Sequence, residues 1–337
     1  MKYTFKNIQN VTLIGGGDTL LYSASKLIEA GFSVRVILAP RHATLSLPIN
    51  KVTLSKALEE LEIDYVELED INKPKILTDI IPSGKSSMAL CFGPAWIFQE
   101  NILDWFGGGM FNFNGIPIPR YLGGAHYTWQ ILNEDRTAGI ALQEITMEID
   151  RGSILRFKKY LLPSNVRIPQ DYFEGNFHFA CKFIDQFVKD MKNNIEFHSF
   201  KYEALDGRRL YFPRLLTIPQ GLINWFWSAK EIELFCRAFD RPYFGASTFL
   251  DGEKVHLKGV LLEKGDVYMH PFCSGLIVRV SKENAWIAAQ GGFLVVNEIY
   301  DSDGNDVIFK LKEGKRFFTP TKLLEEALEF KPFIGSK

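Results

Sequence analysis

The chain has 337 residues, with 39 Lys and Arg residues against 40 Asp and Glu residues and a formal net charge of −1. Hydrophobic residues make up 46% and charged residues 23% of it, which is ordinary for a globular protein and excludes an intrinsically disordered chain. The charge balance argues against a protein whose main task is to bind nucleic acid, and equally against a polybasic membrane-surface protein. The length favours two domains, because single cores stop growing near ~250–300 residues.

The cysteines and the N-terminus indicate a reducing compartment. Cys91, Cys181, Cys236 and Cys273 are far apart, so the chain has no Cys-x-x-Cys pair and no zinc-ligand spacing. The first twenty residues contain no apolar run long enough for a signal peptide, and no run approaches the ~18 apolar residues of a transmembrane helix. We therefore expect a cytoplasmic protein without a membrane partner.

The expected elements begin with a strand over Val11–Ile14, a turn at Gly15–Asp18, a helix over Leu20–Ala30 and a second strand over Phe32–Leu38. This βαβ unit predicts a parallel sheet. The alternation continues to about residue 195. Further helices are expected over 54–61, 75–81, 97–105, 127–132 and 172–193, and further strands over 65–68, 88–92, 110–113, 139–144 and 154–160.

After about residue 195 the pattern changes to short runs that alternate at period two, separated by glycine turns. These runs, over 255–263, 275–280, 286–289 and 293–299, predict a small β-barrel or a related all-β module. The expected domains are an α/β domain over residues 1–195, a linker over 196–222, a β-barrel-like domain over 223–320 and a tail over 321–337.

The glycine turn at Gly15–Asp18 is not a dinucleotide fingerprint. Leu20 stands where the third glycine should be, and the following strand ends without an acidic residue for a ribose hydroxyl. No Gly-Lys-Ser/Thr follows, so it is not a Walker A loop either. The turn still lies at the carboxyl edge of a predicted sheet, where open α/β folds bind ligands.

Residues 109–155 are far more informative. They contain Asn112-Phe-Asn114, a loop with Pro119 and Gly123, then Trp129, Gly139 and finally Asp150-x-Gly152-x-Ile154. This order resembles the folate-dependent formyltransferase family, which includes methionyl-tRNA formyltransferase and the nucleotide-sugar N-formyltransferases. Residues 92–97 resemble the cofactor-side loop of that family, and residues 211–214, 223–225, 236–239 and 242–246 resemble the start of its C-terminal barrel.

The resemblance implies a Rossmann-like formyltransferase domain with a mostly parallel sheet, followed by a small OB-like barrel. It implies transfer of a formyl group from 10-formyltetrahydrofolate to an amine, with no metal. By position, the catalytic residues would be Asn112, Asn114 and Asp150. The cofactor would be bound by Phe92, Gly93, Pro94, Ala95 and Asp150, and the substrate by Gly15, Gly123, Gly124, His126 and Tyr127.

Two positions depart from the family pattern: its catalytic His falls on Asn114 and an Arg after the loop falls on Leu122. Formyl transfer requires donors for the oxyanion and a base for the amine proton. Asn112 and Asn114 lie two apart on a strand, so they point to one side; both can donate hydrogen bonds, but neither can accept a proton. Asp150 and His126 are the candidate bases. Three explanations stay open: an enzyme with an altered base, a ligand-binding pseudoenzyme, or a substitution made to trap a complex.

The acceptor is expected to be a small amine. Residues 40–49, where tRNA-directed members carry a basic insertion, have only two basic positions, Arg41 and His42. By family precedent the acceptor would be a nucleotide-linked amino sugar, and nucleic acid is not an expected partner. Methionyl-tRNA formylation and transfer of the formyl group to water remain alternatives, and a homodimer is left open.

Overall fold

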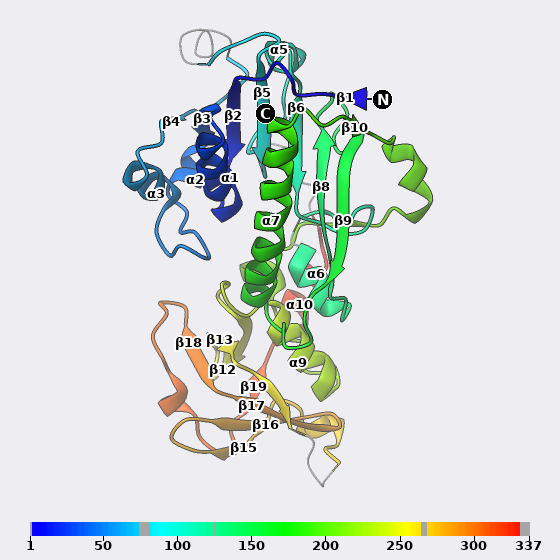
Figure 1. The fold of residues 1–337 in the computed structure, drawn as a ribbon. Helices are drawn as coiled ribbons and strands as arrows, with labels where there is room; N and C mark the ends of the chain where they lie inside the picture. The colour runs from blue at the N-terminus through cyan, green and yellow to red at the C-terminus, as the bar shows by residue number, and fades with distance from the viewer. Residues whose placement is uncertain (1, 74–80, 125, 264–267, 331–337) are drawn as a thin grey trace.

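The computed structural model describes residues 2–73, 81–124, 126–263 and 268–330 (Figure 1). An α/β part occupies the N-terminal half and a β-rich part lies at its far end. The expected helix over 75–81 falls outside the described residues except for Ile81.

A seven-stranded sheet forms the centre of the α/β part. Its order is β4-β3-β2-β5-β6-β8-β9; the first five strands are parallel, β8 is antiparallel to β6, and β9 is antiparallel to β8 and so runs with the first five. The strands are β2 (Asn10–Gly15), β3 (Ser33–Leu38), β4 (Tyr65–Glu67), β5 (Ser87–Phe92), β6 (Met110–Asn114), β8 (Thr137–Glu144) and β9 (Ile154–Leu161). The predicted α/β class with a mostly parallel sheet is confirmed.

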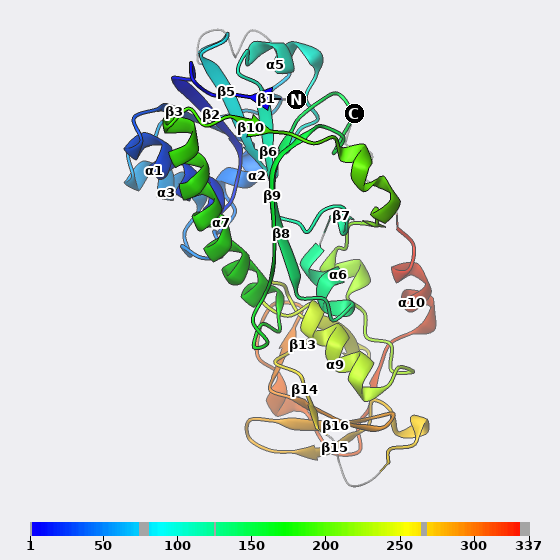
Figure 2. The same ribbon diagram turned by 45° about the vertical axis from the view of Figure 1, so that its right-hand side comes forward.

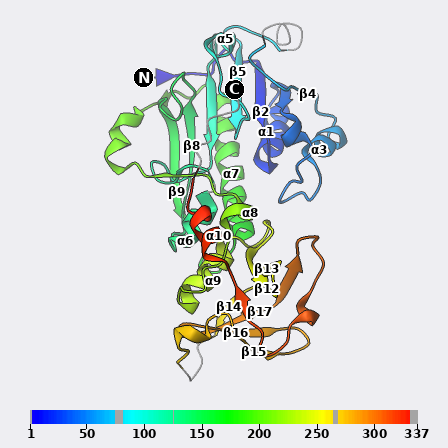
Figure 3. The same ribbon diagram turned by 180° about the vertical axis from the view of Figure 1, so that it is seen from behind.

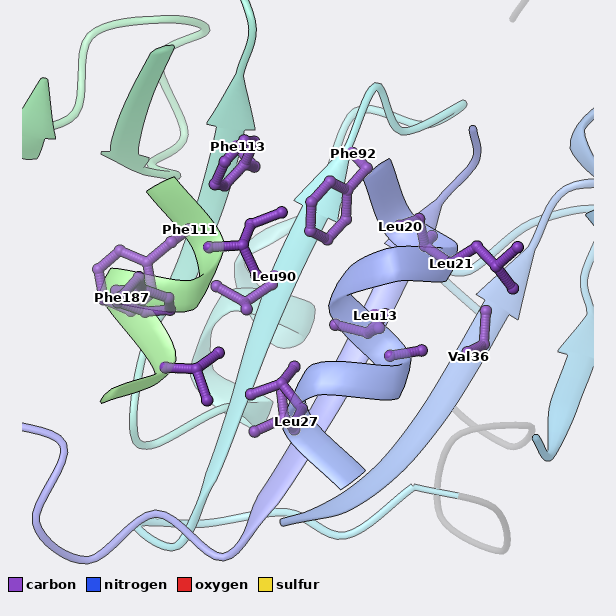
Figure 4. Close-up of a cluster of buried hydrophobic side chains, with 14 of the residues drawn as sticks. Leu13, Leu20, Leu21, Leu27, Val36, Leu90, Phe92, Phe111, Phe113 and Phe187 are labelled. Carbon is purple, nitrogen blue, oxygen red and sulfur yellow. The ribbon is translucent and has the colours of Figure 1, made fainter. Parts of the chain in front are cut away.

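Helices cover both faces of this sheet. The central strand β5 is buried at every position, as expected for a parallel strand packed on both sides. On one face, α1 (Asp18–Glu29) and α7 (Pro169–Lys192) pack side by side over a core that includes Leu13, Leu90 and Phe187 (Figures 2 and 4). On the other face, α5 (Glu100–Trp105) covers a second core with Ile14, Cys91 and Phe106.

Short elements tie distant segments to the sheet. They are β1 (Lys2–Tyr3), α2 (Pro40–Ala43), α3 (Leu54–Glu60), β7 (Leu122–Gly123), α6 (His126–Leu132), β10 (Phe197–His198), the 3₁₀ helix η1 (Tyr202–Arg208), β11 (Tyr211–Phe212) and α8 (Thr217–Gln220). β1 pairs with β10, and β11 pairs with β7 in parallel. These pairings bring the segment after α7 back across the loop that follows β6.

The C-terminal part contains two antiparallel sheets of four strands each, in the orders β18-β13-β12-β19 and β14-β17-β16-β15. The strands are β12 (Ala246–Leu250), β13 (Glu253–Lys258), β14 (Leu261–Glu263), β15 (Ile277–Val280), β16 (Ala285–Ala289), β17 (Gly292–Val296), β18 (Glu298–Asp301) and β19 (Phe317–Phe318). Helices α9 (Ala229–Ala238) and α10 (Thr321–Ala327) and the 3₁₀ helices η2 (Pro271–Cys273) and η3 (Ile308–Lys310) complete it. The predicted C-terminal β module is confirmed.

One core joins the two β sheets to each other and to the helices above them. It contains Leu257 from one sheet and Ile287 from the other, and it continues to Tyr127 of α6 and Tyr172 of α7. Helix α10 returns from the β part toward α8 and α6 (Figure 3). The domain limits stated above stay a prediction, since this core runs across them. Among the described residues, no helix is both long and apolar enough to cross a membrane.

Candidate active site

The carboxyl ends of β5 and β6 open into a pocket of about 470 Å³. This is the edge at which parallel α/β sheets bind ligands. The lining comes from the loop after β5, from β6, and from β8 with the turn that follows it. These residues are Gly93, Pro94, Trp96, Ile97, Phe98, Asn112, Phe113, Asn114, Gly115, Ile116, Gly123, Gln143, Glu144, Ile145, Thr146, Glu148, Ile149 and Asp150.

The two asparagines of β6 face this pocket from the same side of the strand. Along the strand, Phe111 and Phe113 are buried while Asn112 and Asn114 are half-buried, as the alternation of strand side chains requires. The Oδ1 atom of Asn112 is buried and has no hydrogen-bond partner among the described residues. A buried carboxamide oxygen without a partner is costly in a stable fold and is typical of a ligand site.

Asp150 reaches the same pocket from a strained turn. Its φ is 56°, in the left-handed region that non-glycine residues rarely adopt. Burial raises the pKa of its carboxyl above the usual value, and the positive charge of Arg209 opposes that rise. A carboxylate with a raised pKa is a better proton acceptor near neutral pH.

Two neighbours of Asp150 hold the turn against β8. The Nε2 atom of Gln143 donates to the carbonyl oxygens of Asp150 and Gly152, each at 3.1 Å. A Cβ atom on Gly152 would lie 1.9 Å from the carbonyl oxygen of Glu144, so only glycine fits there. The Asp-x-Gly spacing therefore follows from how tightly this turn packs on the strand.

The predicted cofactor loop lies along one wall of the pocket. Phe92 ends β5 and stacks on Phe113 with ring centroids 5.3 Å apart. Gly93 and Pro94 line the pocket, but Ala95 is not among its lining residues. The indole Nε1 of Trp96 donates to the carbonyl oxygen of Glu69 at 2.9 Å, which anchors the loop.

A second pocket of about 280 Å³ shares Gly93, Phe113 and Gly115 with the first. It opens toward the start of α1 and the side of α7. Its further lining residues are Gly16, Gly17, Asp18, Thr19, Pro48, Ile49, Phe92, Tyr127, Ile140, Phe173, Asn176, Phe177 and Ala180. No Lys or Arg is among these described lining residues, so the lining itself offers no cationic side chain to a phosphate.

Asp18 gives the smaller pocket a buried carboxylate. Its oxygens accept hydrogen bonds from the backbone N–H groups of Ile49 and Asn50, at 3.1 and 3.0 Å, and from the Asn50 side chain at 2.7 Å. These bonds fix residues 48–50 as a wall of the pocket. The first turn of a helix favours a negative charge, which further stabilises this position of Asp18.

The predicted substrate-binding residues do not line a single pocket. Gly123 lines the larger pocket and Tyr127 the smaller one. Gly15 lines neither of these two; a Cβ atom there would lie 2.2 Å from the carbonyl oxygen of Phe92, so this glycine serves the contact between β2 and β5. Gly124 packs against Arg214: a Cβ atom on Gly124 would lie 2.9 Å from the Cβ atom of Arg214. The side chain of His126 lies outside the described part of the chain.

The sequence patterns did not identify two polar residues of these pockets. Gln143 is 2% exposed within an otherwise apolar stretch of β8, and Asn176 is 8% exposed on the apolar face of α7. A polar residue at a position where the hydrophobic period predicts core is the signal that could have identified both. Asn176 accepts a hydrogen bond from the Tyr160 hydroxyl and donates to the Gly115 carbonyl at 3.4 Å.

Comparison with known proteins finds similarity to formyltransferases. The family description "Formyl transferase, C-terminal domain" matches residues 216–308. The bifunctional polymyxin resistance protein ArnA of Wigglesworthia glossinidia brevipalpis is 27% identical over 235 residues, which are 68% of this chain and 34% of that protein. A methionyl-tRNA formyltransferase of Desulfotalea psychrophila is 26% identical over 205 residues, 60% of each chain. The chain thus spans less than two thirds of the length of both relatives.

Solved structures show the same fold. The N-formyltransferase from Helicobacter canadensis, in complex with folinic acid and dTDP-3-aminofucose, superimposes with a TM-score of 0.60. The match covers 87% of this chain and 100% of that chain at 18% sequence identity.

Proposed function

From its similarity to formyltransferases, we propose that the chain transfers a formyl group from 10-formyltetrahydrofolate to the amine of a small molecule. One observation carries this proposal. Asn112, Asn114 and Asp150, far apart in two segments of the sequence, line one pocket at the carboxyl ends of the strands. Two hydrogen-bond donors and one carboxylate are the groups that acyl transfer to an amine needs.

The larger pocket suits a reduced folate. Its volume of about 470 Å³ lies in the range of small-molecule sites, ~300–1,000 Å³. Trp96 and Ile97 offer apolar surface for a flat ring, and the unpartnered Oδ1 of Asn112 offers an acceptor. The Helicobacter canadensis relative is described with folinic acid bound. When bound, the folate supplies the formyl group and its leaving nitrogen.

Asn112, Asn114 and Asp150 then have different roles in the transfer. Asn112 and Asn114 donate N–H groups toward the formyl oxygen as negative charge develops on it. As the amine nitrogen bonds to the formyl carbon, Asp150 accepts the proton that the amine loses. Its raised pKa suits this task, and it returns the proton to the leaving nitrogen when the old carbon–nitrogen bond breaks. This assignment gives the reaction a base although residue 114 is not histidine.

The smaller pocket is the place for the amine. It meets the larger one at Gly93, Phe113 and Gly115, so an amine held there approaches the formyl carbon from the opposite side. Its carboxylate can accept a hydrogen bond from an amine, and its four phenylalanine rings can pack against the ring that carries the amine. At about 280 Å³ it holds a sugar-sized group, and any nucleotide and phosphates attached to that group lie outside it. The dTDP-3-aminofucose named for the relative supports an amino sugar on a nucleotide.

Asn114 favours a second candidate, a pseudoenzyme that binds these ligands without turnover. Removing a general base typically costs roughly 10²–10⁴ in rate. The methionyl-tRNA formyltransferase relatives keep tRNA among the acceptors to be tried.

One assay separates these readings. The purified chain is incubated with 10-formyltetrahydrofolate and a panel of acceptors: dTDP- and UDP-linked amino sugars, and methionyl-tRNA. Products are followed by mass spectrometry, with Asp150→Asn as a control. We expect a formamide from at least one nucleotide-linked amino sugar. Folate binding without any formamide supports the pseudoenzyme, and formate release without an amine indicates transfer to water. If neither the chain nor its Asn114→His variant forms a formamide, the transferase reading is wrong.

A further inference from the structure

Gln143 joins the strand β8 to the turn that carries Asp150. Its amide nitrogen has two hydrogens, and Nε2 lies 3.1 Å from the carbonyl oxygens of both Asp150 and Gly152. The two acceptors are two residues apart, on either side of Arg151. One side chain therefore holds both ends of the segment whose backbone direction decides where the Asp150 carboxylate points.

This segment needs such support because its backbone is unfavourable by itself. A non-glycine residue in the left-handed region is unfavourable by itself and persists only when its surroundings fix it. Asp150 is such a residue, with φ at 56°. The turn is also pressed onto β8: the Glu144 N–H donates to the Ser153 carbonyl at 2.8 Å, and Gly152 leaves no room for a side chain.

Gln143 is placed to couple the turn to the rest of the site. It lies opposite Asn112 in the register of β6 and β8, and both residues line the larger pocket. Its own side chain is almost fully buried, so water cannot readily replace the two hydrogen bonds it makes. Loss of these bonds would leave two carbonyl groups unpaired and release the turn from the strand.

We propose that Gln143 is a positioning residue, which holds Asp150 in the orientation that proton transfer requires and does not itself touch the reacting atoms. The assignment rests on the proposed function in so far as Asp150 is the base. Its structural content, that Gln143 fixes residues 150–152, can be measured without any turnover.

The test replaces Gln143 with methionine, which has a similar length and no donor. Gln130→Met is the matched control, because Gln130 is equally buried and donates its Nε2 to the Thr137 carbonyl, away from both pockets. Hydrogen exchange of a peptide covering residues 144–155 is measured in both variants and in the unchanged chain. We expect exchange in this segment to rise at least about tenfold in Gln143→Met and to stay unchanged in Gln130→Met.

Kinetics with the acceptor that the formamide assay identifies give the second readout. We expect Gln143→Met to lower kcat about tenfold or more and to leave the KM for the formyl donor within about threefold. The acidic limb of the pH–rate profile should move, and Asp150→Asn should cost little more in the Gln143→Met background than Gln143→Met alone. A purely structural role would lower thermal stability in both methionine variants and leave the pH profile in place.

The outcomes separate the two proposals. No turnover by the unchanged chain removes the proposed function, and the exchange experiment still decides whether Gln143 holds the turn. Unchanged exchange over residues 144–155 overturns the inference whatever the activity. Normal kcat and an unmoved pH profile in Gln143→Met, with an active parent chain, overturn its catalytic consequence.

Discussion

Asn112 of β6 lies directly opposite Gln143 of β8 in the antiparallel register. Directly opposite residues bring their Cβ atoms within about 4.5–5.5 Å, so the two carboxamides are neighbours on the pocket wall. Gln143 commits its nitrogen to the turn at Asp150, whereas the Oδ1 of Asn112 is buried without a partner among the described residues. The pair thus divides into one carboxamide that serves the fold and one that is left for a ligand.

The first prediction concerns Asn112. We expect Asn112→Ala to lower kcat/KM for formyl transfer about 10²–10³-fold, as loss of one oxyanion donor does. Its thermal midpoint should change little, because the Oδ1 atom makes no hydrogen bond in the described structure. Both quantities are measured on the same preparation.

Asn112→Asp is the sharper control. It keeps the shape and the Oδ1 oxygen of the side chain, but an oxygen replaces the NH2 group, so it cannot donate an N–H. We expect it to lose as much activity as Asn112→Ala. Activity at the level of the parent chain in Asn112→Asp would show that the N–H group is not used.

The second prediction concerns Asn114. Asn114→His places a second group that can accept a proton beside Asn112; because Asp150 is the proposed base, we expect kcat near pH 7 to change by less than about tenfold. Asn114→Ala, which removes the donor and adds no base, should be slower than the parent chain. Steady-state rates of the three proteins at one saturating acceptor concentration check this order. A histidine variant faster than the parent chain by about 10²–10⁴-fold, the usual worth of a general base, would mean that Asp150 does not act as the base.

The α/β part could be predicted from the sequence because its signals are local and repeated. The βαβ unit at residues 11–38 shows an apolar run, a glycine turn and a helical period in succession, and the observed β2, α1 and β3 follow that order. The two-residue strands β1, β7, β10 and β11 could not be predicted in this way. A strand of two residues has no period, and its partner lies far away in the chain.

The candidate site likewise has features that sequence patterns predict and features that they do not. The family resemblance brought Asn112, Asn114 and Asp150 together, and the structure places them on one pocket. The separation of Gly123 and Tyr127 into two pockets depends on how the loop after β6 meets α7, which no local pattern records. Gln143 stands out in the sequence only as a polar residue in an apolar strand. Its role was missed because the two hydrogen bonds go to backbone carbonyls, which no residue type in the sequence marks.

The third prediction is a pH dependence set by Asp150. Burial holds the pKa of its carboxyl above the usual 3.8 in the folded protein. Folding therefore favours the protonated form, and this contribution to stability is full below about pH 3.8 and is lost as the pH rises through the folded pKa. Asp150→Asn has no carboxyl to ionise, so it does not lose stability as the pH rises. We therefore expect its free energy of unfolding to exceed that of the parent chain at pH 7 and to match it at low pH.

The activity should change with pH in the opposite direction to this contribution to stability. A base must be ionised, so the transfer rate should fall as the pH drops through the raised pKa of Asp150. Denaturant unfolding at several pH values gives the stability, and initial rates over the same pH series give the activity. Asp303→Asn, on an exposed turn of the β part, is the matched control. A stability difference between Asp150→Asn and the parent chain that does not vary with pH would contradict this origin.

The fourth prediction separates a structural glycine from a binding one. Gly15 has φ at 126°, and a Cβ atom there would lie 2.2 Å from the Phe92 carbonyl oxygen in the paired strand β5. We expect Gly15→Ala to destabilise the fold by about 3 kcal/mol or more, from backbone strain and overpacking together. Gly304→Ala is the control, because Gly304 also has a positive φ, of 85°, but a Cβ atom there would meet no described atom within 4 Å. It should cost only about 1 kcal/mol, from the backbone alone.

Thermal and denaturant midpoints of both variants measure these costs. If Gly15 acted in substrate binding alone, Gly15→Ala would keep the parent midpoint and raise only the KM of the acceptor. The contact with Phe92 predicts a different result. The midpoint falls, and the activity that remains is proportional to the fraction of protein that is still folded.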